Sequence, residues 1–350
     1  MFLRVLSAVV LTVISFPLVA ADYQDANLSP EERVRDLLPR MTLEEKIGQM
    51  AQYVGIEHIA KSEKNMSIEE LRRSDARGFY PNLHSSQMPE VIKSGKVGSF
   101  LHVVTAEEAN MLQRYAQDSR LGIPLLIGID AIHGNALVRG ATVYPAPMSM
   151  ASTWNLDLVR RANEETAIEM RATGSHWSFT PNIDIARDPR WGRVGETFGE
   201  DSYLVGEMGV ATIDGLQQGD FTGPTKVIAN AKHWVAGGDP INGINLSPMD
   251  ISIRTLREDF FPPFKRAIDA GVFTFMAAHN EINGVPAHSN HFILTEVLRD
   301  EWGFDGFVVS DWMDVGRLHT FHRTATSPKD AVRQAVQGGI DMHMHGPSFL

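Results

Sequence analysis

Short apolar runs alternate with helical patterns from residue 97 onward, and this alternation restricts the fold more than any other feature of the sequence. Seven runs are typical of buried strands: Val97–Val104, Pro124–Ile129, Trp177–Asn182, Val227–Trp234, Val272–His279, Gly306–Ser310 and Ile340–Met344. Six helical patterns lie between them: Ala106–Leu121, Leu156–Thr173, Ser202–Gln218, Ile253–Ala270, Phe292–Trp302 and Ala331–Gln337. Strands that alternate with helices are typical of βαβ units, so the sequence predicts a parallel sheet.

We predict the α/β class and, within it, a TIM-like (β/α)8 barrel. A doubly wound sheet is disfavoured because no glycine-rich turn follows the first predicted strand. A (β/α)8 barrel needs eight strands, and the pattern reveals seven. We therefore expect the eighth strand to be irregular, to be missing, or to lie in the polar stretch from Lys61 to Lys93, which we interpret as a surface excursion.

Length, charge and cysteine content exclude several classes of protein. The 350 residues suit one large barrel, and an apolar content of 43% is enough for a substantial core. A formal net charge of −11 does not fit a nucleic-acid-binding protein. Because there are no cysteines, disulfide scaffolds, thiolate metal sites and cysteine nucleophiles are excluded. No cofactor and no metal are expected.

The N-terminus has the pattern of a signal peptide. One cation, Arg4, precedes an apolar run from Val5 to Ala20, and the small residues Val19 and Ala21 fit the cleavage rule. We predict a signal peptide at residues 1–21 and a barrel domain at 22–350. The mature protein is then periplasmic or secreted, with no membrane association after the signal is removed.

Titratable and amide side chains recur at the ends of the predicted strands. They are Asp130, His133, Asp184, Lys232, His233, His279, Asn280, Asp311, His343 and His345. In a (β/α)8 barrel the C-terminal ends of the strands form the active site, so this recurrence predicts a catalytic mouth there.

Asp311 is the clearest of these positions, because a buried strand delivers it with Trp312 directly after it. An aromatic face suits the C–H groups of a sugar ring, and a carboxylate suits chemistry at the anomeric carbon. The alternative is that Asp311 is the N-cap of the following helix. In a second cluster, the three arginines of the segment 187–193 can bind sugar hydroxyls or form ion pairs with Glu196, Glu200 and Asp201, and we expect both uses.

Five segments together resemble glycoside hydrolase family 3, the family of exo-acting β-glucosidases, β-xylosidases and exo-glucanases. They are Gly128–Gly134 (GIDAIHG), Asp188–Arg193 (DPRWGR), Lys232–Trp234 (KHW), Asn283–Ala287 (NGVPA) and Val309–Trp312 (VSDW). The segments follow the order and spacing of the family over nearly all of the chain after residue 21.

The resemblance implies roles for individual residues. The aspartate of the Ser-Asp-Trp motif is the family's catalytic nucleophile, which corresponds to Asp311. The residues that the resemblance assigns to binding of the terminal sugar are Asp130, Arg193, Lys232, His233 and Trp312, with Met276 and His279 in a more variable wall. Many relatives have tyrosine or phenylalanine at the position of His279.

The activity implied is that of an exo-acting retaining glycosidase, which releases terminal β-D-glucose from β-linked oligosaccharides or from aryl and alkyl β-glucosides through a glycosyl-Asp311 intermediate. A β-xylosidase or exo-β-glucanase of the same family is the alternative. In most of the family a glutamate from a second α/β sandwich domain is the acid/base. We therefore expect that this domain is absent here and that the acid/base lies beyond Leu350; Glu281 and Asp239 are possible substitutes within the chain.

Two other classes of function remain as alternatives. A metal-dependent barrel hydrolase would use the His-x-His pair, His343 and His345, together with His133, His233 and Asp311. An inactive carbohydrate-binding remnant would bind sugars without turnover.

Overall fold

The computed structural model describes residues 22–65, 80, 83–219 and 223–345. The predicted signal peptide at residues 1–21 lies outside this range. The chain divides into two compact units, Met1–Thr42 and Leu43–Leu350. The described part of the first unit consists of η1 (Asp22–Gln24), α1 (Pro30–Leu37) and η2 (Leu38–Arg40). Helix α1 begins with a capping box, in which Ser29 accepts the Glu32 N–H and the Glu32 carboxylate accepts the Ser29 N–H.

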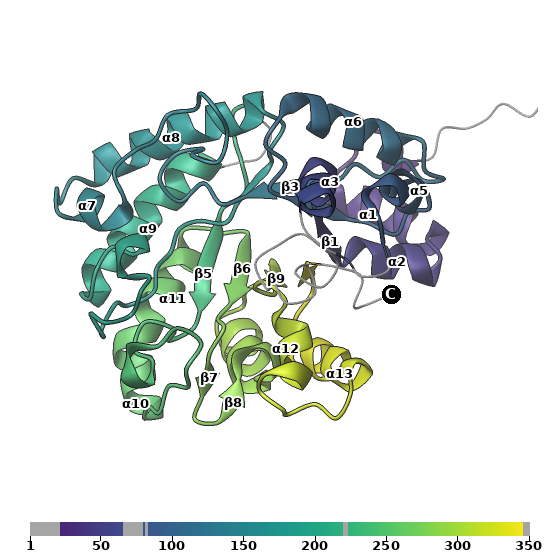
Figure 1. Ribbon diagram of the computed structural model, residues 1–350. Helices are drawn as coiled ribbons and strands as arrows, with labels where there is room; N and C mark the ends of the chain where they lie inside the picture. The colour runs from purple at the N-terminus through teal and green to yellow at the C-terminus, as the bar shows by residue number, and fades with distance from the viewer. Residues whose placement is uncertain (1–21, 66–79, 81–82, 220–222, 346–350) are drawn as a thin grey trace, which may run out of the picture. The chain divides into compact units, whose positions relative to one another are not determined.

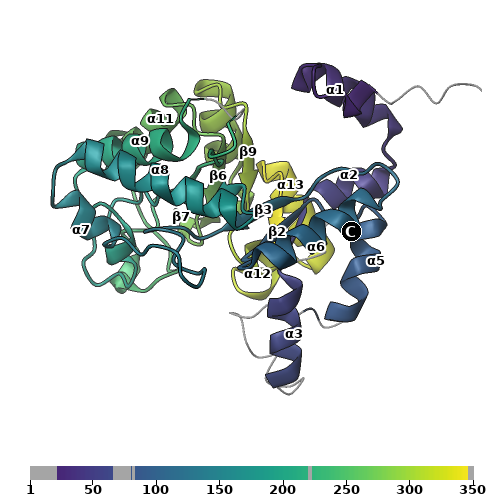
Figure 2. The same cartoon turned by 90° about the horizontal axis from the view of Figure 1, so that it is seen from above.

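The second unit is a (β/α)8 barrel (Figures 1 and 2). Its eight parallel strands are β1 (Ala51–Val54), β2 (Ser99–Leu101), β3 (Leu126–Ile129), β4 (Trp177–Ser178), β5 (Asn230–Trp234), β6 (Thr274–Ala277), β9 (Phe307–Val309) and β10 (His343–Met344). Five of them form one ladder in the order β10-β1-β2-β3-β4, and three form a second in the order β5-β6-β9.

Two parallel bridges close these ladders into a ring. Trp177 pairs with Ile228 just before β5, and Val309 pairs with Met342 just before β10. The first and last strands are also neighbours, with Ala51 opposite His343. All seven strands predicted from the apolar runs are therefore present, and the eighth is the first of the chain, β1.

The expectation that one strand is irregular or missing is wrong. Strand β1 has four residues, all buried, and it lies before the polar stretch rather than within it. It escapes the pattern because it is short and contains Gln52. Burial of this amide is tolerated because Gln52 Nε2 donates to Ser99 Oγ at 2.8 Å on the neighbouring strand.

The described helices of this unit surround the sheet. They are α2 (Leu43–Gln49), α3 (Ile56–Asn65), α5 (Met88–Lys93), α6 (Ala106–Gln117), α7 (Pro147–Ala151), α8 (Leu156–Ala172), α9 (Ser202–Gln217), α10 (Ile253–Thr255), α11 (Phe261–Asp269), α12 (Asp314–Thr320) and α13 (Pro328–Gly338). Two π-helical segments, η6 (Leu256–Phe260) and η8 (Phe292–Glu301), complete the predicted helices at 253–270 and 292–302. Helices α8, α9 and α11 lie side by side along the outside of the barrel (Figures 1 and 2).

The remaining elements are short. They are the helical turns η3 (Ser85–Gln87), η4 (Val194–Glu196), η5 (Ile241–Gly243) and η7 (Ala287–Ser289), and a hairpin of β7 (Glu281–Ile282) and β8 (Val285–Pro286). The polar stretch predicted as a surface excursion is helical at both ends. It also contributes to the core, because Met88 and Ile92 are buried and the Tyr80 hydroxyl accepts the Val54 N–H at 3.0 Å. Residues 66–79 lie outside the described part.

The core has two apolar layers. One packs side chains of the helices against the outer face of β5, β6 and β9, with Trp234 in contact with Phe264 and Phe275. The other includes Phe100, Trp177 and further side chains of β1 to β4. These layers fix the strands, so that residues just beyond the strand ends are held on a rigid frame. In the described part, no helix is long and apolar enough to cross a membrane.

Candidate active site

Asp311 lies two residues beyond the end of β9 and is only 7% exposed. Its carboxylate is held at both oxygens. Oδ1 accepts the Trp312 N–H at 2.6 Å, and Oδ2 forms an ion pair with His279 Nε2 at 2.9 Å. Asp311 also donates its backbone N–H to His288 Nε2 at 2.9 Å. The alternative of a helix N-cap is wrong, because α12 begins at Asp314 and its N-cap is Met313.

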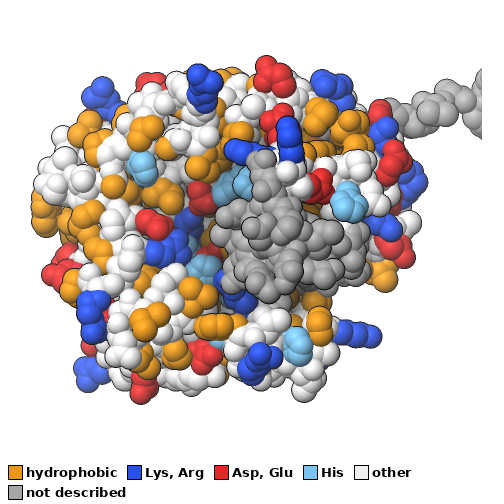
Figure 3. Space-filling view, viewed as in Figure 1, with side chains coloured by type: hydrophobic (Ala, Val, Ile, Leu, Met, Phe, Trp, Pro, Cys, Tyr) orange, Lys and Arg blue, Asp and Glu red, His pale blue; other side chains and the backbone are white. Residues whose placement is uncertain are grey.

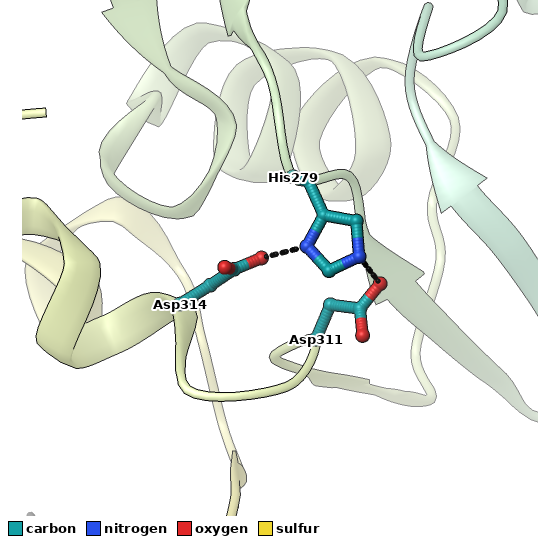
Figure 4. A group of neighbouring side chains, drawn as sticks. All are labelled: His279, Asp311 and Asp314. Carbon is teal, nitrogen blue, oxygen red and sulfur yellow. Dashed lines mark hydrogen bonds and ion pairs between the residues drawn. The ribbon is translucent and has the colours of Figure 1, made fainter. Parts of the chain in front are cut away.

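The His279 ring lies between two carboxylates (Figure 4). Its Nε2 faces Asp311, and its Nδ1 lies 2.7 Å from Asp314 Oδ2. Burial alone would lower the pKa of this ring, but Asp311 and Asp314 raise the pKa to about 10. A ring with a carboxylate oxygen within 3 Å of each nitrogen is favoured as an imidazolium. Burial likewise favours the neutral acid at Asp311, yet His279 and Arg193 hold its pKa well below the usual range. The carboxylate is therefore ionised at neutral pH.

His233, by contrast, is a neutral histidine. It accepts a hydrogen bond at Nε2 from Arg193 Nη2 at 3.0 Å, and its Nδ1 donates to Asp184 Oδ2 at 2.8 Å. Burial and the charge of Arg193 lower its pKa. Arg193 itself forms an ion pair with Glu196 at 2.9 Å. His233 Nε2 lies 3.5 Å from Asp311 Oδ2, so this group forms one wall beside the carboxylate.

Asp130, directly after β3, forms a second charged group. Its Oδ1 accepts a hydrogen bond from Lys232 Nζ at 2.6 Å, and its Oδ2 lies 2.9 Å from His102 Nε2. Burial would raise the pKa of Asp130, but Lys232 and His102 lower it. Each oxygen keeps a lone pair that a ligand hydroxyl can use. Lys232 and His233 both reach the pocket although they are adjacent, because the strand register shifts between Ala231 and Trp234.

These two groups line one pocket of about 340 Å³ at the C-terminal ends of the strands. It contains all eight residues to which the sequence assigned a role: Asp130, Arg193, Lys232, His233, Met276, His279, Asp311 and Trp312. Leu101, His102, Ile132, Leu137, Glu196 and Met344 complete the lining. Figure 3 shows acidic, basic and histidine side chains gathered near the middle of this face of the molecule.

All three arginines of the cluster form ion pairs, as the sequence predicted for some of them, and Arg193 alone of the three lines the pocket. Arg193 lies in the pocket, whereas Arg190 forms an ion pair with Asp188 at 2.6 Å and Arg187 with Asp259 at 2.6 Å. Of the three acidic partners proposed from the sequence, Glu196 pairs with Arg193.

Two residues of the metal alternative, His133 and His345, have other contacts. His133 Nδ1 donates to the Tyr144 carbonyl at 3.1 Å, and the His345 ring packs against Trp312 at 4.1 Å between ring centres. In the described part, one group has ligand atoms close enough together for an ion, namely His279, Asp311 and Asp314, within 4.8 Å. Both ring nitrogens of His279 face carboxylates, however, and an imidazolium has no lone pair for a metal.

Sequence reasoning missed two residues of this arrangement. His102 follows β2 as Asp130 follows β3, so the strand-end argument could have identified it. Asp314 is three residues after Asp311, in the first turn of α12, and it is buried. No pattern in the sequence marks Asp314, because its partner His279 lies on a different strand end.

Charged side chains gathered at the C-terminal ends of the strands are typical of the active site of an α/β-barrel enzyme. A family model described as the glycosyl hydrolase family 3 N terminal domain matches residues 42–349. The chain therefore belongs to glycosyl hydrolase family 3.

Named relatives and solved structures agree with this assignment. The chain is 37% identical to a periplasmic beta-glucosidase of Salmonella typhimurium over 91% of its own length and 38% of the relative's. It is 44% identical to a beta-xylosidase of Formosa agariphila over 71% of its length and 36% of the relative's.

Among solved structures, the chain is similar to a β-glucosidase from Erythrobacter marinus, with a TM-score of 0.82 and 33% identity over 94% of this chain and 42% of that one. A beta-glucosidase from Listeria innocua in complex with isofagomine gives a TM-score of 0.78 and 31% identity, covering 92% and 42%. The chain thus spans about two fifths of the length of these relatives.

Proposed function

We propose that this chain carries the sugar-binding pocket and the nucleophile of an exo-acting retaining β-glucosidase. The observation that carries the proposal is the Asp311 carboxylate, ionised and fixed at both oxygens, in the same pocket as the Asp130–Lys232 pair. Family membership and the names of the relatives support the glycosidase class.

Attack by Asp311 on the anomeric carbon would give a covalent glycosyl-enzyme, and hydrolysis of that ester would give net retention. A nucleophile must be ionised, and the cations around Asp311 favour that state. The glycosyl ester would form at one Asp311 oxygen as the bond from the anomeric carbon to the leaving group breaks, and the leaving group would depart with the electron pair of that bond.

The remaining charged side chains suit sugar hydroxyls. Asp130 offers acceptor oxygens. The side chains of Lys232 and Arg193 are fixed by hydrogen bonds to carboxylates and offer their other N–H groups to the sugar. A site that pairs each hydroxyl of one sugar rejects sugars that lack one, because its buried polar groups would lose their partners. Trp312, beside the nucleophile, offers an aromatic face to the ring.

A β-xylosidase is the second candidate for this pocket, since one of the relatives is named for that activity. Nitrophenyl β-D-glucoside and β-D-xyloside, assayed in parallel, distinguish the two: we expect the higher kcat/KM on the glucoside. Isolation of a glycosyl-Asp311 peptide after treatment with an activated 2-fluoro glucoside tests the mechanism. A label on any other residue would contradict it.

We also propose that the protein is exported. The pattern of residues 1–21 and the periplasmic relative of Salmonella typhimurium support this location. N-terminal sequencing of the mature protein tests it, and Asp22 is the expected first residue.

A further inference from the structure

We propose that Asp314 is a positioning residue for the nucleophile and that it acts through His279, whose ring is held as an imidazolium between the two carboxylates. The inference rests on the proposed role of Asp311. It adds a role for two residues that lie beside the reacting carboxylate.

The geometry of the three side chains carries the proposal (Figure 4). Asp314 Oδ2 lies 2.7 Å from His279 Nδ1, and the opposite ring nitrogen lies 2.9 Å from Asp311 Oδ2. The Asp314 side chain is fully buried, and its other oxygen accepts a hydrogen bond from Arg317 Nη1 at 2.8 Å. Arg317 Nη1 also donates to the Trp312 carbonyl at 3.0 Å. Asp314 is therefore fixed from two sides.

The charges around the ring favour its protonated form. The titratable and charged groups that face His279 or its two partners are Asp311, Asp314, His233, His288, Arg193 and Arg317. His233 accepts from Arg193 and His288 accepts the Asp311 N–H, each at Nε2, so neither ring carries a proton on that nitrogen. Burial lowers the pKa of His288 to about 4. The ring of His279 therefore faces two anions and two neutral histidines.

Asp314 thereby fixes the orientation of the nucleophile. The Asp311 carboxylate has two side tethers, the Trp312 N–H and His279 Nε2. If Asp314 loses its charge, the His279 ring can lose its Nδ1 proton, turn, or change tautomer. The tether at Oδ2 then weakens, and the carboxylate leaves the position from which it attacks. Loss of a carboxylate that orients a metal-ligating histidine costs about 10- to 100-fold, and we expect a loss of the same order for a histidine that holds a nucleophile.

The first experiment measures labelling of the full 350-residue chain by a dinitrophenyl 2-fluoro-β-glucoside, whose leaving group needs no acid. The variants are Asp314→Asn and, as a control, Asp259→Asn, which removes the charge of a surface ion pair with Arg187. We expect Asp314→Asn to be labelled about 10- to 100-fold more slowly. In the plot of labelling rate against pH, the decline at high pH should begin about one pH unit or more lower in this variant. The reason is that one of the two anions that stabilise the protonated His279 ring is gone. Asp259→Asn should match the wild type.

A double-mutant cycle with His279→Gln separates positioning from a general loss of structure. Glutamine keeps an amide donor near Asp311 but cannot be an imidazolium. The labelling rate of the double variant should therefore be little lower than that of His279→Gln alone. Additive losses would overturn the proposal, because they would show that Asp314 acts without His279.

Side-chain nitrogen NMR, with the His279 signal assigned by its loss in His279→Gln, reports the ring directly. In the wild type we expect the His279 ring to remain an imidazolium through neutral pH. In Asp314→Asn we expect the ring to lose its proton near neutral pH. Titration near neutral pH in the wild type, or equal labelling rates and pH profiles for wild type and Asp314→Asn, would overturn the inference alone. If the wild type acquires no label on Asp311, the proposed nucleophile is wrong and the inference falls with it.

Discussion

The rings of His233 and His279 lie 6.0 Å apart and stack nearly parallel, yet their surroundings drive their pKa values in opposite directions. His233 accepts a hydrogen bond from an arginine and is neutral, whereas His279 forms ion pairs with two carboxylates and is charged. Asp311 Oδ2, the proposed nucleophile's oxygen, lies 3.5 Å from His233 Nε2 and 2.9 Å from His279 Nε2. His279 thus places a positive charge beside Asp311, whereas His233 places a neutral ring there.

Asp311→Asn should abolish glycosidase activity and leave the fold intact. The amide cannot attack the anomeric carbon, so the expected loss in kcat is at least about 10³-fold on an activated aryl β-glucoside. Circular dichroism should be unchanged. Asp305→Asn, at an exposed position on the loop before β9, is the matched control. A variant that retains a tenth of the wild-type turnover would show that another residue is the nucleophile.

Asp130→Ala and Arg193→Ala should each raise KM and lower kcat together. Contacts to a sugar that distorts on the way to the transition state strengthen there, so their loss affects both constants. Each charged hydrogen bond is worth about 1.5–3 kcal/mol, which predicts a loss of roughly 10- to 100-fold in kcat/KM. Arg190→Ala, in the same loop as Arg193 but paired with Asp188, should have wild-type kinetics. Unchanged kinetics in both pocket variants would place the sugar elsewhere.

The rate at which a protein of these 350 residues cleaves glycosides should depend steeply on the leaving group. The three carboxyls that line the pocket, Asp130, Glu196 and Asp311, all have pKa values below their usual range because of neighbouring cations, so none is a proton donor at neutral pH. A dinitrophenyl glucoside should be cleaved and cellobiose should be almost inert. Azide, which needs no base, should accelerate turnover of the activated substrate.

Glu281 is the in-chain residue that could contradict this expectation. Its carboxylate lies 2.7 Å from His322 Nδ1, which fixes it outside the pocket lining. Brisk cellobiose hydrolysis that is lost in Glu281→Gln would identify it as the acid, and the same result with Asp239→Asn would identify Asp239.

Acid should destabilise the fold partly through two histidines, His176, which is partly buried, and His288, which is buried. Burial lowers the pKa of His176 and of His288 to about 4, whereas an unfolded histidine titrates near 6.5. The unfolded chain therefore binds more protons between these values, and stability is lost as the pH falls from about 6.5 to about 4. Between these two pH values the free energy of unfolding, measured with urea, should fall by about 1–3 kcal/mol less in His176→Gln than in the wild type. His84→Gln, at an exposed position, is the control; equal pH dependence in wild type and His176→Gln would exclude this contribution.

His279 acts on stability in the opposite sense. Its folded pKa is raised to about 10, so its contribution is complete below about pH 6.5 and is lost as the pH rises through the folded value. Alkaline destabilisation should therefore be smaller in His279→Gln than in the wild type. Denaturant unfolding at neutral and at alkaline pH measures the difference.

Much of the fold could be predicted because buried parallel strands are continuous apolar runs bounded by turn residues. The run Gly306–Ser310 is one such case, and β9 lies within it. Strand β1 escaped because its four residues include Gln52, whose burial depends on a serine of the next strand. A buried amide whose N–H group is bound on the neighbouring strand has no signal in a single sequence.

The pocket could be predicted where one residue follows one strand. Asp130 and Asp311 lie just beyond strand ends and Lys232 lies within β5, and the barrel brings the three together. The partners of His279 could not be predicted in the same way. His279 and Asp314 are 35 residues apart in the sequence, and they meet because they follow β6 and β9, which pair side by side in one ladder.

The pairing of β1 with β10 also has a consequence for how the protein is made. Ala51 cannot find its partner His343 until nearly the entire barrel has been synthesised. A nascent chain released or cleaved earlier has two open strand edges, and such edges pair with other chains. Contacts between residues so distant in sequence form slowly. We therefore expect ring closure to be the late step of folding, and incomplete chains to be prone to aggregation.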